Sequence, residues 1–257
     1  MIWVEFALTG LFAGFMAGYL GIGGGVILVP VLSWIFSRDP ATADIAVQMA
    51  VATSLATMLF SSLSSILAQQ RKGAILWDTA KQLLPGLLLG AIVGALIADS
   101  ISSDVLGRVF GVFLLIIGAQ MLYGKRKRAD RPLPGAMFTA IVGAGIGSLS
   151  SLFGVGGGSM TVPWLLRHGQ RIQNSIATAA ACGYPIAVAG TIAFVFLGPG
   201  NSATLGYVDL KALAGIAVFS VMGAPLGVWA IHRSKPAIAK RIFAVFLLAG
   251  AARMLMA

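Results

Sequence analysis

Charged residues are scarce in this chain. They account for 10% of its 257 residues, and only 8 of them are Asp or Glu, whereas about a quarter of a soluble domain is charged. This leaves too little polar surface to cover a soluble globule of the same length. The hydrophobic fraction of 58% and the mean hydropathy of +0.93 therefore predict a membrane protein.

Reactive side chains are equally rare. The single cysteine, Cys182, excludes an internal disulfide and argues against a thiolate metal cluster. Both histidines fall in predicted turns, and no Asp or Glu lies in the middle of an apolar run. A membrane-embedded enzyme would need such groups, so we expect no catalytic residue, no metal and no cofactor. Their absence also disfavours a carboxylate-coupled symporter, because proton and sodium sites within membranes commonly use an acidic residue.

Apolar runs recur from one end of the chain to the other. They are continuous rather than alternating, which predicts helices and not a barrel, and most approach the roughly 20 residues that a spanning helix needs. The first run begins almost at Met1 with no basic leader and no cleavage signature, so we interpret it as structure rather than as a signal peptide. The predicted apolar stretches are residues 2–36, 45–68, 82–98, 105–123, 135–166, 172–197, 210–231 and 237–256.

The second half of the chain repeats the first at a constant shift. The sequence Gly21-Ile-Gly-Gly-Gly-Val-Ile-Leu-Val-Pro30 matches Gly154-Val-Gly-Gly-Gly-Ser-Met-Thr-Val-Pro163. At the same shift, Gly90 and Gly94 match Gly223 and Gly227, and residues 108–115 match residues 241–248. Matches in three separate places at one offset indicate a duplication. We therefore divide the chain into a first repeat (1–124), a basic cytoplasmic linker (125–134) and a second repeat (135–257).

The basic residues indicate how each half is oriented. If the turns alternate between the two sides of the membrane, one side holds 14 of the 18 Lys and Arg residues, and the rule that positive loops stay inside makes that side cytoplasmic. Those residues are Arg71, Lys72, Lys81, Lys125, Arg126, Lys127, Arg128, Arg131, Arg167, Arg171, Arg233, Lys235, Lys240 and Arg241.

Turns that correspond in the two repeats then face opposite sides, which predicts inverted repeats. Each half must cross the membrane an odd number of times, and three clear spans follow each glycine motif. The glycine-interrupted stretch must therefore be a hairpin of two short helices with the glycines at its apex. The predicted fold is an all-α polytopic protein of the bacterial inner membrane, with two inverted repeats and both termini periplasmic. Each repeat contains one glycine-apex hairpin and three transmembrane helices.

The glycine apexes are the first candidate site. Broken helices at mid-membrane in inverted repeats point to a transporter's binding site, and the free N–H groups at a helix start form an anion site. The alternative is close helix packing, which we expect of Gly10, Gly14 and Gly18. Consecutive glycines break a helix instead, so for them we favour the binding interpretation. The candidates are Gly23, Gly24, Gly25, Gly156, Gly157, Gly158 and Ser159.

Neutral polar residues in the spans after each hairpin are the second group of candidates. Such donors suit an oxyanion because they bind it without a fixed compensating charge. The alternatives are hydrogen bonds between helices and hydroxyls that bond back to their own helix, and the sequence leaves these open. The residues are Gln48, Thr53 and Ser54 in the first half, and Asn174, Ser175 and Thr178 in the second.

Three motifs resemble a known family. They are the doubled Gly-x-Gly-Gly-Gly-x-x-x-x-Pro, the Ala52-Thr53-Ser54 sequence after its first copy, and the repeated Arg-x-Phe-x-Val-Phe-Leu-Leu. Together they resemble the TauE/SafE sulfite exporter family, also called the toluene-sulfonate uptake permeases, over nearly the whole chain. The resemblance implies an inner-membrane carrier for sulfite, sulfonates or related oxyanions and leaves its direction open. Residues 177–180 read Ala-Thr-Ala-Ala where the first half has Ala-Thr-Ser, so the two half-sites are not equivalent.

The functional prediction is an exporter or uniporter of a small sulfur-containing anion, such as sulfite or an organosulfonate, bound between the glycine apexes. An anion that leaves a cell with a negative interior moves down the potential, by roughly 2.3 kcal/mol per charge per 100 mV, so export needs no coupling ion. The alternative is an anion channel or a proton-coupled uptake permease for organic anions.

The expected partners are the anion and the lipid bilayer. Nucleic acid is not expected, because the net charge of +10 lies in short turns and not on a broad basic face. The oligomeric state is left open, with a homodimer among the alternatives.

Overall fold

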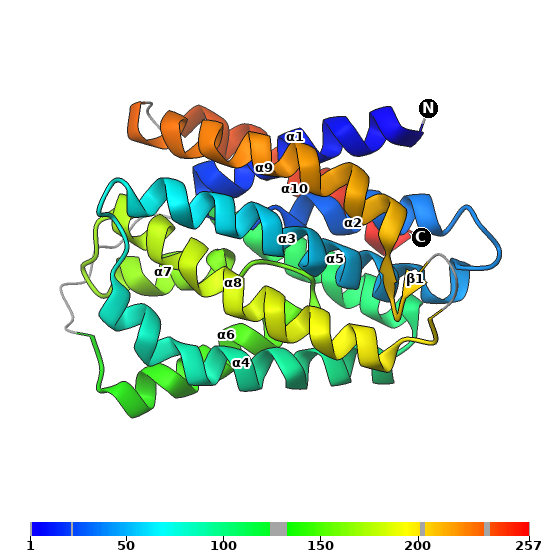
Figure 1. The fold of residues 1–257 in the computed structure, drawn as a ribbon, viewed down its shortest axis with the longest axis horizontal. Helices are drawn as coiled ribbons and strands as arrows, with labels where there is room; N and C mark the ends of the chain where they lie inside the picture. The colour runs from blue at the N-terminus through cyan, green and yellow to red at the C-terminus, as the bar shows by residue number, and fades with distance from the viewer. Residues whose placement is uncertain (1, 22, 124–132, 201–203, 234–236, 257) are drawn as a thin grey trace.

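The computed structural model describes residues 2–21, 23–123, 133–200, 204–233 and 237–256, and these residues form ten α-helices (Figure 1). The first half contains α1 (Ile2–Leu20), α2 (Gly25–Phe36), α3 (Ala46–Gln70), α4 (Trp77–Ser100) and α5 (Ser103–Tyr123). The second half contains α6 (Ala136–Leu152), α7 (Gly158–Arg167), α8 (Ile172–Leu197), α9 (Leu210–Arg233) and α10 (Ala237–Met256). A short 3₁₀ turn, η1 (Ala43–Ile45), precedes α3, and a hairpin of β1 (Thr204–Leu205) and β2 (Val208–Asp209) precedes α9.

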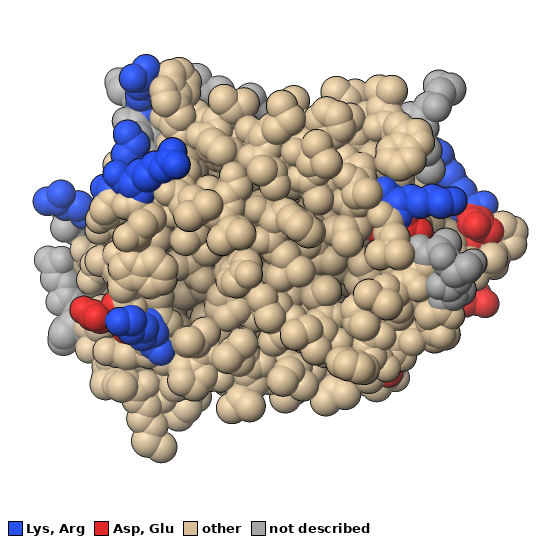
Figure 2. All heavy atoms as spheres, viewed as in Figure 1, with Lys and Arg blue, Asp and Glu red and all other residues tan. Residues whose placement is uncertain are grey.

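A belt of exposed apolar side chains surrounds the bundle. Leu89 and Phe196 are 66% and 84% exposed, which is unfavourable in water but suits a hydrocarbon solvent. Six of the described helices are long and apolar enough to cross a membrane. On the face that Figure 2 shows, charged side chains gather at the two ends and leave the middle uncharged. The prediction of an all-α, multi-pass membrane protein is confirmed.

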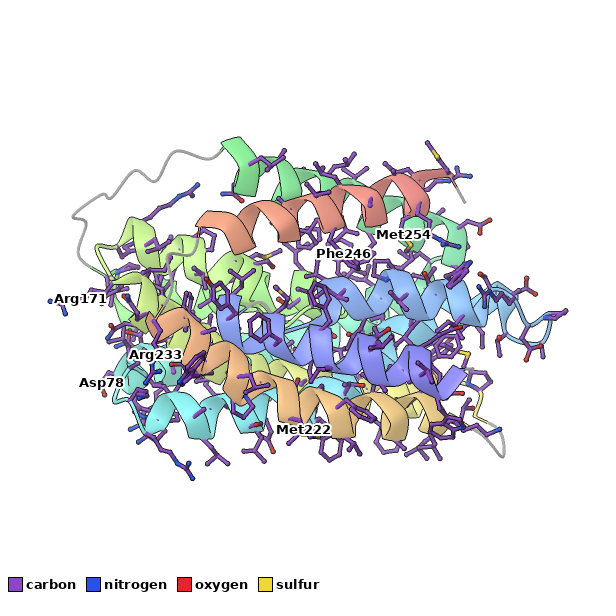
Figure 3. All side chains as sticks on the ribbon, turned by 90° about the horizontal axis from the view of Figure 1, so that it is seen from above. Asp78, Arg171, Met222, Arg233, Phe246 and Met254 are labelled. Atoms are coloured by element: carbon purple, nitrogen blue, oxygen red, sulfur yellow. The ribbon has the colours of Figure 1, made fainter. Side chains whose placement is uncertain are left out.

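The two ends of the bundle differ in charge and in the turns they hold. We call one the basic end, because exposed Arg71, Lys72, Arg171 and Arg233 lie there; Figure 3 labels Arg171 and Arg233 beside each other. We call the other the terminal end, because both chain termini lie there with the α2–α3 turn and the β1–β2 hairpin (Figure 1). The described turns therefore fall at the ends where the alternating assignment places them. Which end faces the cytoplasm stays a prediction.

The helices pair in a pattern that is unchanged when the two halves are exchanged. Helix α1 packs along α9, and their counterparts α6 and α4 pack along each other at the opposite edge of the bundle. Between these pairs, α3 packs against α8 and α5 against α10, so each of these helices contacts its own counterpart. This is the arrangement that a twofold relation between duplicated halves produces. The orientation of each half in a membrane is not decided by it.

Small residues make the outer helix pairs possible. A Cβ on Gly10 would lie 2.6 Å from the Ile216 carbonyl oxygen, and a Cβ on the corresponding Gly143 would lie 2.6 Å from the Leu83 carbonyl oxygen. Glycine lets the backbones approach this closely in the absence of a hydrophobic driving force between helices. The packing role expected of Gly10, Gly14 and Gly18 is confirmed, because all three lie against the backbone of α9.

The structure corrects two details of the predicted helices. The glycine hairpins are not formed by two short helices, because α1 has 19 residues and is about 28 Å long at 1.5 Å per residue. Only the second arms, α2 and α7, are short, with 12 and 10 residues. In addition, α4 begins at Trp77, inside the polar stretch at residues 69–81 that was predicted to be a turn between two apolar runs. Asp78 and Lys81 belong to the first turns of this helix, where they are exposed. The predicted linker at 125–134 falls mostly outside the described residues.

Candidate functional site

Each glycine motif forms a tight turn between a long and a short helix. Gly24, just before α2, has a φ of 72°, and Gly157, just before α7, has a φ of 65°. Both lie in the left-handed region, which side chains with a Cβ rarely adopt. The same backbone conformation at equivalent positions explains why both copies keep glycine there.

The two apexes touch each other inside the bundle. A Cβ on Gly23 would lie 2.5 Å from the Cα of Gly156, and a Cβ on Gly25 would overlap the Gly154 carbonyl oxygen. That oxygen also accepts a hydrogen bond of 2.9 Å from the Ser54 hydroxyl of α3. Both short helices begin at this contact, and α2 runs toward the terminal end while α7 runs toward the basic end (Figure 1). Residues separated by 129 and 133 positions are thus brought into one backbone contact.

The amides of the second apex are partly engaged within it. The Gly157 N–H donates to the Val155 carbonyl at 2.9 Å, and the Gly158 N–H donates to the Gly156 carbonyl at 2.6 Å. An anion at this helix start would have to compete with these short-range bonds. The hydroxyls of Ser159 and Thr161 are buried and have no hydrogen-bond partner within the described part of the chain. Two donors therefore remain available on the first turn of α7.

Two threonines make equivalent bonds between the halves. The Thr53 hydroxyl accepts a hydrogen bond of 3.0 Å from the backbone N–H of Asp209, immediately before α9. The Thr178 hydroxyl accepts one of 2.9 Å from the backbone N–H of Leu76, immediately before α4. Because α4 and α9 are counterparts, one contact is the repeat of the other. Each threonine therefore links the start of a helix in the opposite half of the chain to a buried helix of its own half.

A hydrogen bond joins the β1–β2 hairpin to the last turns of α4 at the terminal end. The Tyr207 hydroxyl donates to an Asp99 carboxylate oxygen at 2.8 Å. Partial burial and then this neighbouring carboxylate raise the pKa of Tyr207 to about 12. The phenol therefore stays protonated, and keeps donating, at any physiological pH.

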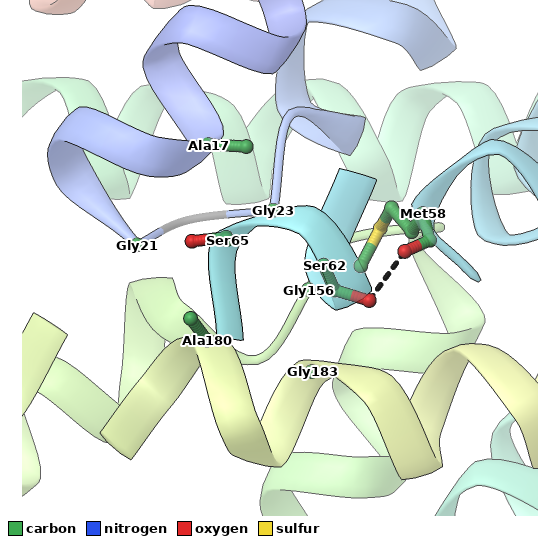
Figure 4. Close-up of a pocket in the computed structure, with 9 residues that line it drawn as sticks. All are labelled: Ala17, Gly21, Gly23, Met58, Ser62, Ser65, Gly156, Ala180 and Gly183. Carbon is green, nitrogen blue, oxygen red and sulfur yellow. Dashed lines mark hydrogen bonds between the residues drawn. The ribbon is translucent and has the colours of Figure 1, made fainter. Parts of the chain in front are cut away.

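A small pocket lies beside the touching apexes (Figure 4). Its open volume is about 10 Å³, roughly the space that one water molecule needs. We call this arrangement, in which the apexes touch and only a water-sized space is open beside them, the closed state. The pocket is lined by Ala17, Gly21, Gly23, Met58, Ser62, Ser65, Gly156, Ala180 and Gly183.

Comparison with known proteins settles the family. Residues 6–254 match the family described as "Sulfite exporter TauE/SafE". The chain belongs to the TauE/SafE family. A TauE/SafE relative in Haemophilus influenzae, named a probable membrane transporter protein, is 29% identical over 252 residues, which is 96% of each chain. Another in Methanocaldococcus jannaschii, with the same description, is 27% identical and covers 86% of this chain and 83% of its own. No solved structure matches this chain.

The predicted site residues of this TauE/SafE protein fall into two groups. Gly23, Gly25, Gly156 and Ser54 are gathered at the apex contact. Of the other predicted polar residues, Gln48, Asn174 and Ser175 lie farther along the spans, whereas Thr53 directly precedes Ser54 and Ser159 lies on the first turn of α7. Gln48 is six residues before Ser54, about 9 Å along α3, and its side-chain amide donates to the Ile101 carbonyl at 2.9 Å.

The polar residues at the start of α8 are also distant from the apexes. The Ser175 hydroxyl donates to the Arg171 carbonyl at 3.0 Å, and Asn174 lies beside it, half-buried at the basic end. Gly183, which lies against the apex carbonyl of Gly156, is eight residues farther along α8, or about 12 Å. In this closed state the apexes and the polar starts of α3 and α8 are separate places. A substrate contact at any of these residues stays a prediction.

The pocket also contains residues that the sequence analysis missed. Met58, Ser62 and Ser65 come from the span after the first hairpin, and Gly183 comes from the span after the second. Their spacing of four and three residues places Met58, Ser62 and Ser65 on one face of α3. Ser54, four residues before Met58, extends that face to the apex contact. The serines of this face were the available signal in the sequence, but they have no counterparts in α8, so the internal repeat does not point to them.

Proposed function

We propose that this TauE/SafE protein carries a small sulfur-containing anion, such as sulfite or an organosulfonate, across the bacterial inner membrane as an exporter or uniporter. The anion binds between the two glycine apexes. Membership of the family and the transporter names of the relatives support transport. The sulfur anion and the apex site are the parts that this proposal adds.

One observation carries the choice of site: the buried starts of two helices, α2 and α7, meet at glycine turns near the centre of the bundle. The dipoles of two such helices place partial positive charge on the same spot. Glycine there leaves the backbone N–H groups uncovered by side chains, as anion sites at helix starts require. The unpartnered Ser159 and Thr161 hydroxyls add donors on one of the two helices.

The closed state implies movement during transport. The apexes touch and the adjacent pocket holds about one water molecule. The helix starts must therefore separate before an anion binds between them.

The proposal predicts saturable anion flux in proteoliposomes that contain the purified protein. We expect accumulation or release of at least one anion from a panel of sulfite, sulfate, thiosulfate, taurine, sulfoacetate and an aryl sulfonate. Competing anions should inhibit that flux, because a carrier offers one site to all of them. Flux that rises linearly with concentration would indicate a channel instead. If no member of the panel moves, the sulfur-anion proposal is wrong.

The proposed orientation places the basic end in the cytoplasm and both termini in the periplasm. Positive loops remain inside, and the exposed Arg71, Lys72, Arg167 and Arg171 lie at the basic end. We expect alkaline phosphatase fused after residue 257 to be active, since this reporter folds only in the periplasm. The matched fusion at Gly73, in the turn at the basic end, should be inactive. The reverse pattern would contradict the proposed orientation, and equal activity of the two fusions would contradict their placement on opposite sides of the membrane.

A further inference from the structure

One hydroxyl in the apex pocket lacks a partner. Ser65 lies on the buried face of α3 and is 1% exposed, and its Oγ makes no hydrogen bond within the described part of the chain. Figure 4 shows this oxygen directed into the space between Gly21 and Ala180. It is the kind of buried polar atom for which a structure usually provides water or a ligand.

The energetic cost of this arrangement makes it informative. A buried hydroxyl without a partner destabilises the folded protein, and an alanine at the same place would avoid that penalty. Serine at position 65 is thus unfavourable for folding in the closed state. A group outside the protein that accepts its hydrogen bond would offset the penalty.

Ser62 supplies a second hydroxyl one turn away. In the closed state it donates back to the Met58 carbonyl of its own helix (Figure 4). A serine hydroxyl can leave such a bond by rotation about χ1. Two hydroxyls three residues apart on one helix face can therefore reach two oxygen atoms of the same oxyanion.

The pair is present on one helix only. The spacing between Thr53 and Thr178 places Ser62 opposite Ala187 and Ser65 opposite Gly190, and neither counterpart has a hydroxyl. Ser65 is eleven residues beyond Ser54 toward the basic end, about 16 Å along α3. Because Ser54 bonds the apex carbonyl of Gly154, the serine pair lies on the basic-end side of the apex contact. The α3 serine pair is therefore specific to the basic-end side, while the place that corresponds to Ser65 on the other side holds the Ser151 hydroxyl of α6, beside Gly190.

We propose that Ser65, assisted by Ser62, binds the oxyanion on the basic-end side of the apexes and determines which anions are accepted. The hydroxyls donate to oxygens of the anion as it passes between the basic end and the glycine turns. They carry no charge, so they hold the anion without neutralising it and let it leave. This inference rests on the proposed transport function.

The test compares transport and stability of Ser65→Ala with those of the wild type. In proteoliposomes, with whichever anion of the panel the wild type transports, we expect the KM of Ser65→Ala to rise about tenfold or more, because a hydrogen bond to a charged group is lost. Its thermal midpoint without anion should be equal to or above that of the wild type. Ser65→Thr, which retains the hydroxyl, should keep the KM within about twofold.

The matched control is Ser61→Ala. Ser61 is a buried serine on the same helix, and it does not line the pocket. We expect its KM to be unchanged. A wild-type KM in Ser65→Ala, or an equal rise in Ser61→Ala, would overturn the inference while leaving the transport function intact. If the wild type moves no anion of the panel, the proposed function fails and this inference fails with it.

Discussion

Substitution of Gly24 or Gly157 by leucine is expected to abolish anion transport while leaving protein inserted in the membrane. Both residues hold a left-handed turn, where a side chain costs about 1–2 kcal/mol. A Cβ on Gly24 would also lie 2.9 Å from the Ala13 carbonyl oxygen, and one on Gly157 would lie 2.8 Å from Ile186 Cδ1. The apex must then change shape, and the helix starts that bind the anion move with it. The measurement is initial flux in proteoliposomes at matched protein content.

Gly145→Leu is the matched control for that experiment. Gly145 lies on the exposed side of α6, and a Cβ there would meet nothing within 4 Å. We expect this variant to insert and to transport at close to the wild-type rate. Normal transport by both Gly24→Leu and Gly157→Leu would show that the apexes only pack against each other.

Substitution of Gly90 or Gly223 by alanine is expected to destabilise the folded protein by about 2–3 kcal/mol, in the range measured for overpacked cores. A Cβ on Gly90 would overlap the Ala144 carbonyl oxygen of α6, and one on Gly223 would overlap the Leu11 carbonyl oxygen of α1. The added carbon meets backbone, which cannot rotate away as a flexible side chain can. Each helix pair must therefore separate along its length. The loss should appear as a lower thermal midpoint in detergent, measured by the fraction that remains monodisperse after heating.

The sign of the change distinguishes packing from helix propensity. Alanine is favoured over glycine within a helix by about 1 kcal/mol, so a glycine that makes no close contact should gain stability. Gly107 of α5 is the control, because a Cβ there would lie 3.6 Å from a Val47 methyl, at an ordinary contact distance. We expect Gly107→Ala to raise the thermal midpoint. A rise in Gly90→Ala and Gly223→Ala as well would contradict the packing role of these glycines.

Helix boundaries were predictable to different degrees along the chain. The spans at 172–197 and 237–256 match α8 and α10 at both ends, because charged or glycine-containing turns border their apolar runs. The start of α4 was missed because Asp78 and Lys81 read as part of a turn. In a membrane protein, the first helical turns can project beyond the hydrocarbon and carry charge, so hydropathy alone underestimates such a helix.

The polar candidates were predicted less well than the glycines. Thr53 and Thr178 were correctly paired by the repeat, and the structure gives both the same inter-half hydrogen bond. Their hydroxyls thus have a structural task in the closed state, one of the alternatives that the sequence left open. Ser65 was missed because its role depends on burial in the pocket without a hydrogen-bond partner, which only the tertiary structure shows. The residue at its repeat position in α8 is a glycine, so the duplication does not point to it either.

The sequence by itself determined the membrane setting, the helical spans, the duplication and the positions of the two glycine turns. These follow from local properties: apolar length, a constant shift and the backbone freedom of glycine. Only the tertiary structure decided that α1 lies along α9, that the two apexes touch, and that Ser65 lines the pocket beside them. Helices in lipid associate through close packing of small residues rather than through burial of apolar surface. A glycine in the sequence therefore shows that a close contact is possible, while the partner is fixed only when the whole bundle packs.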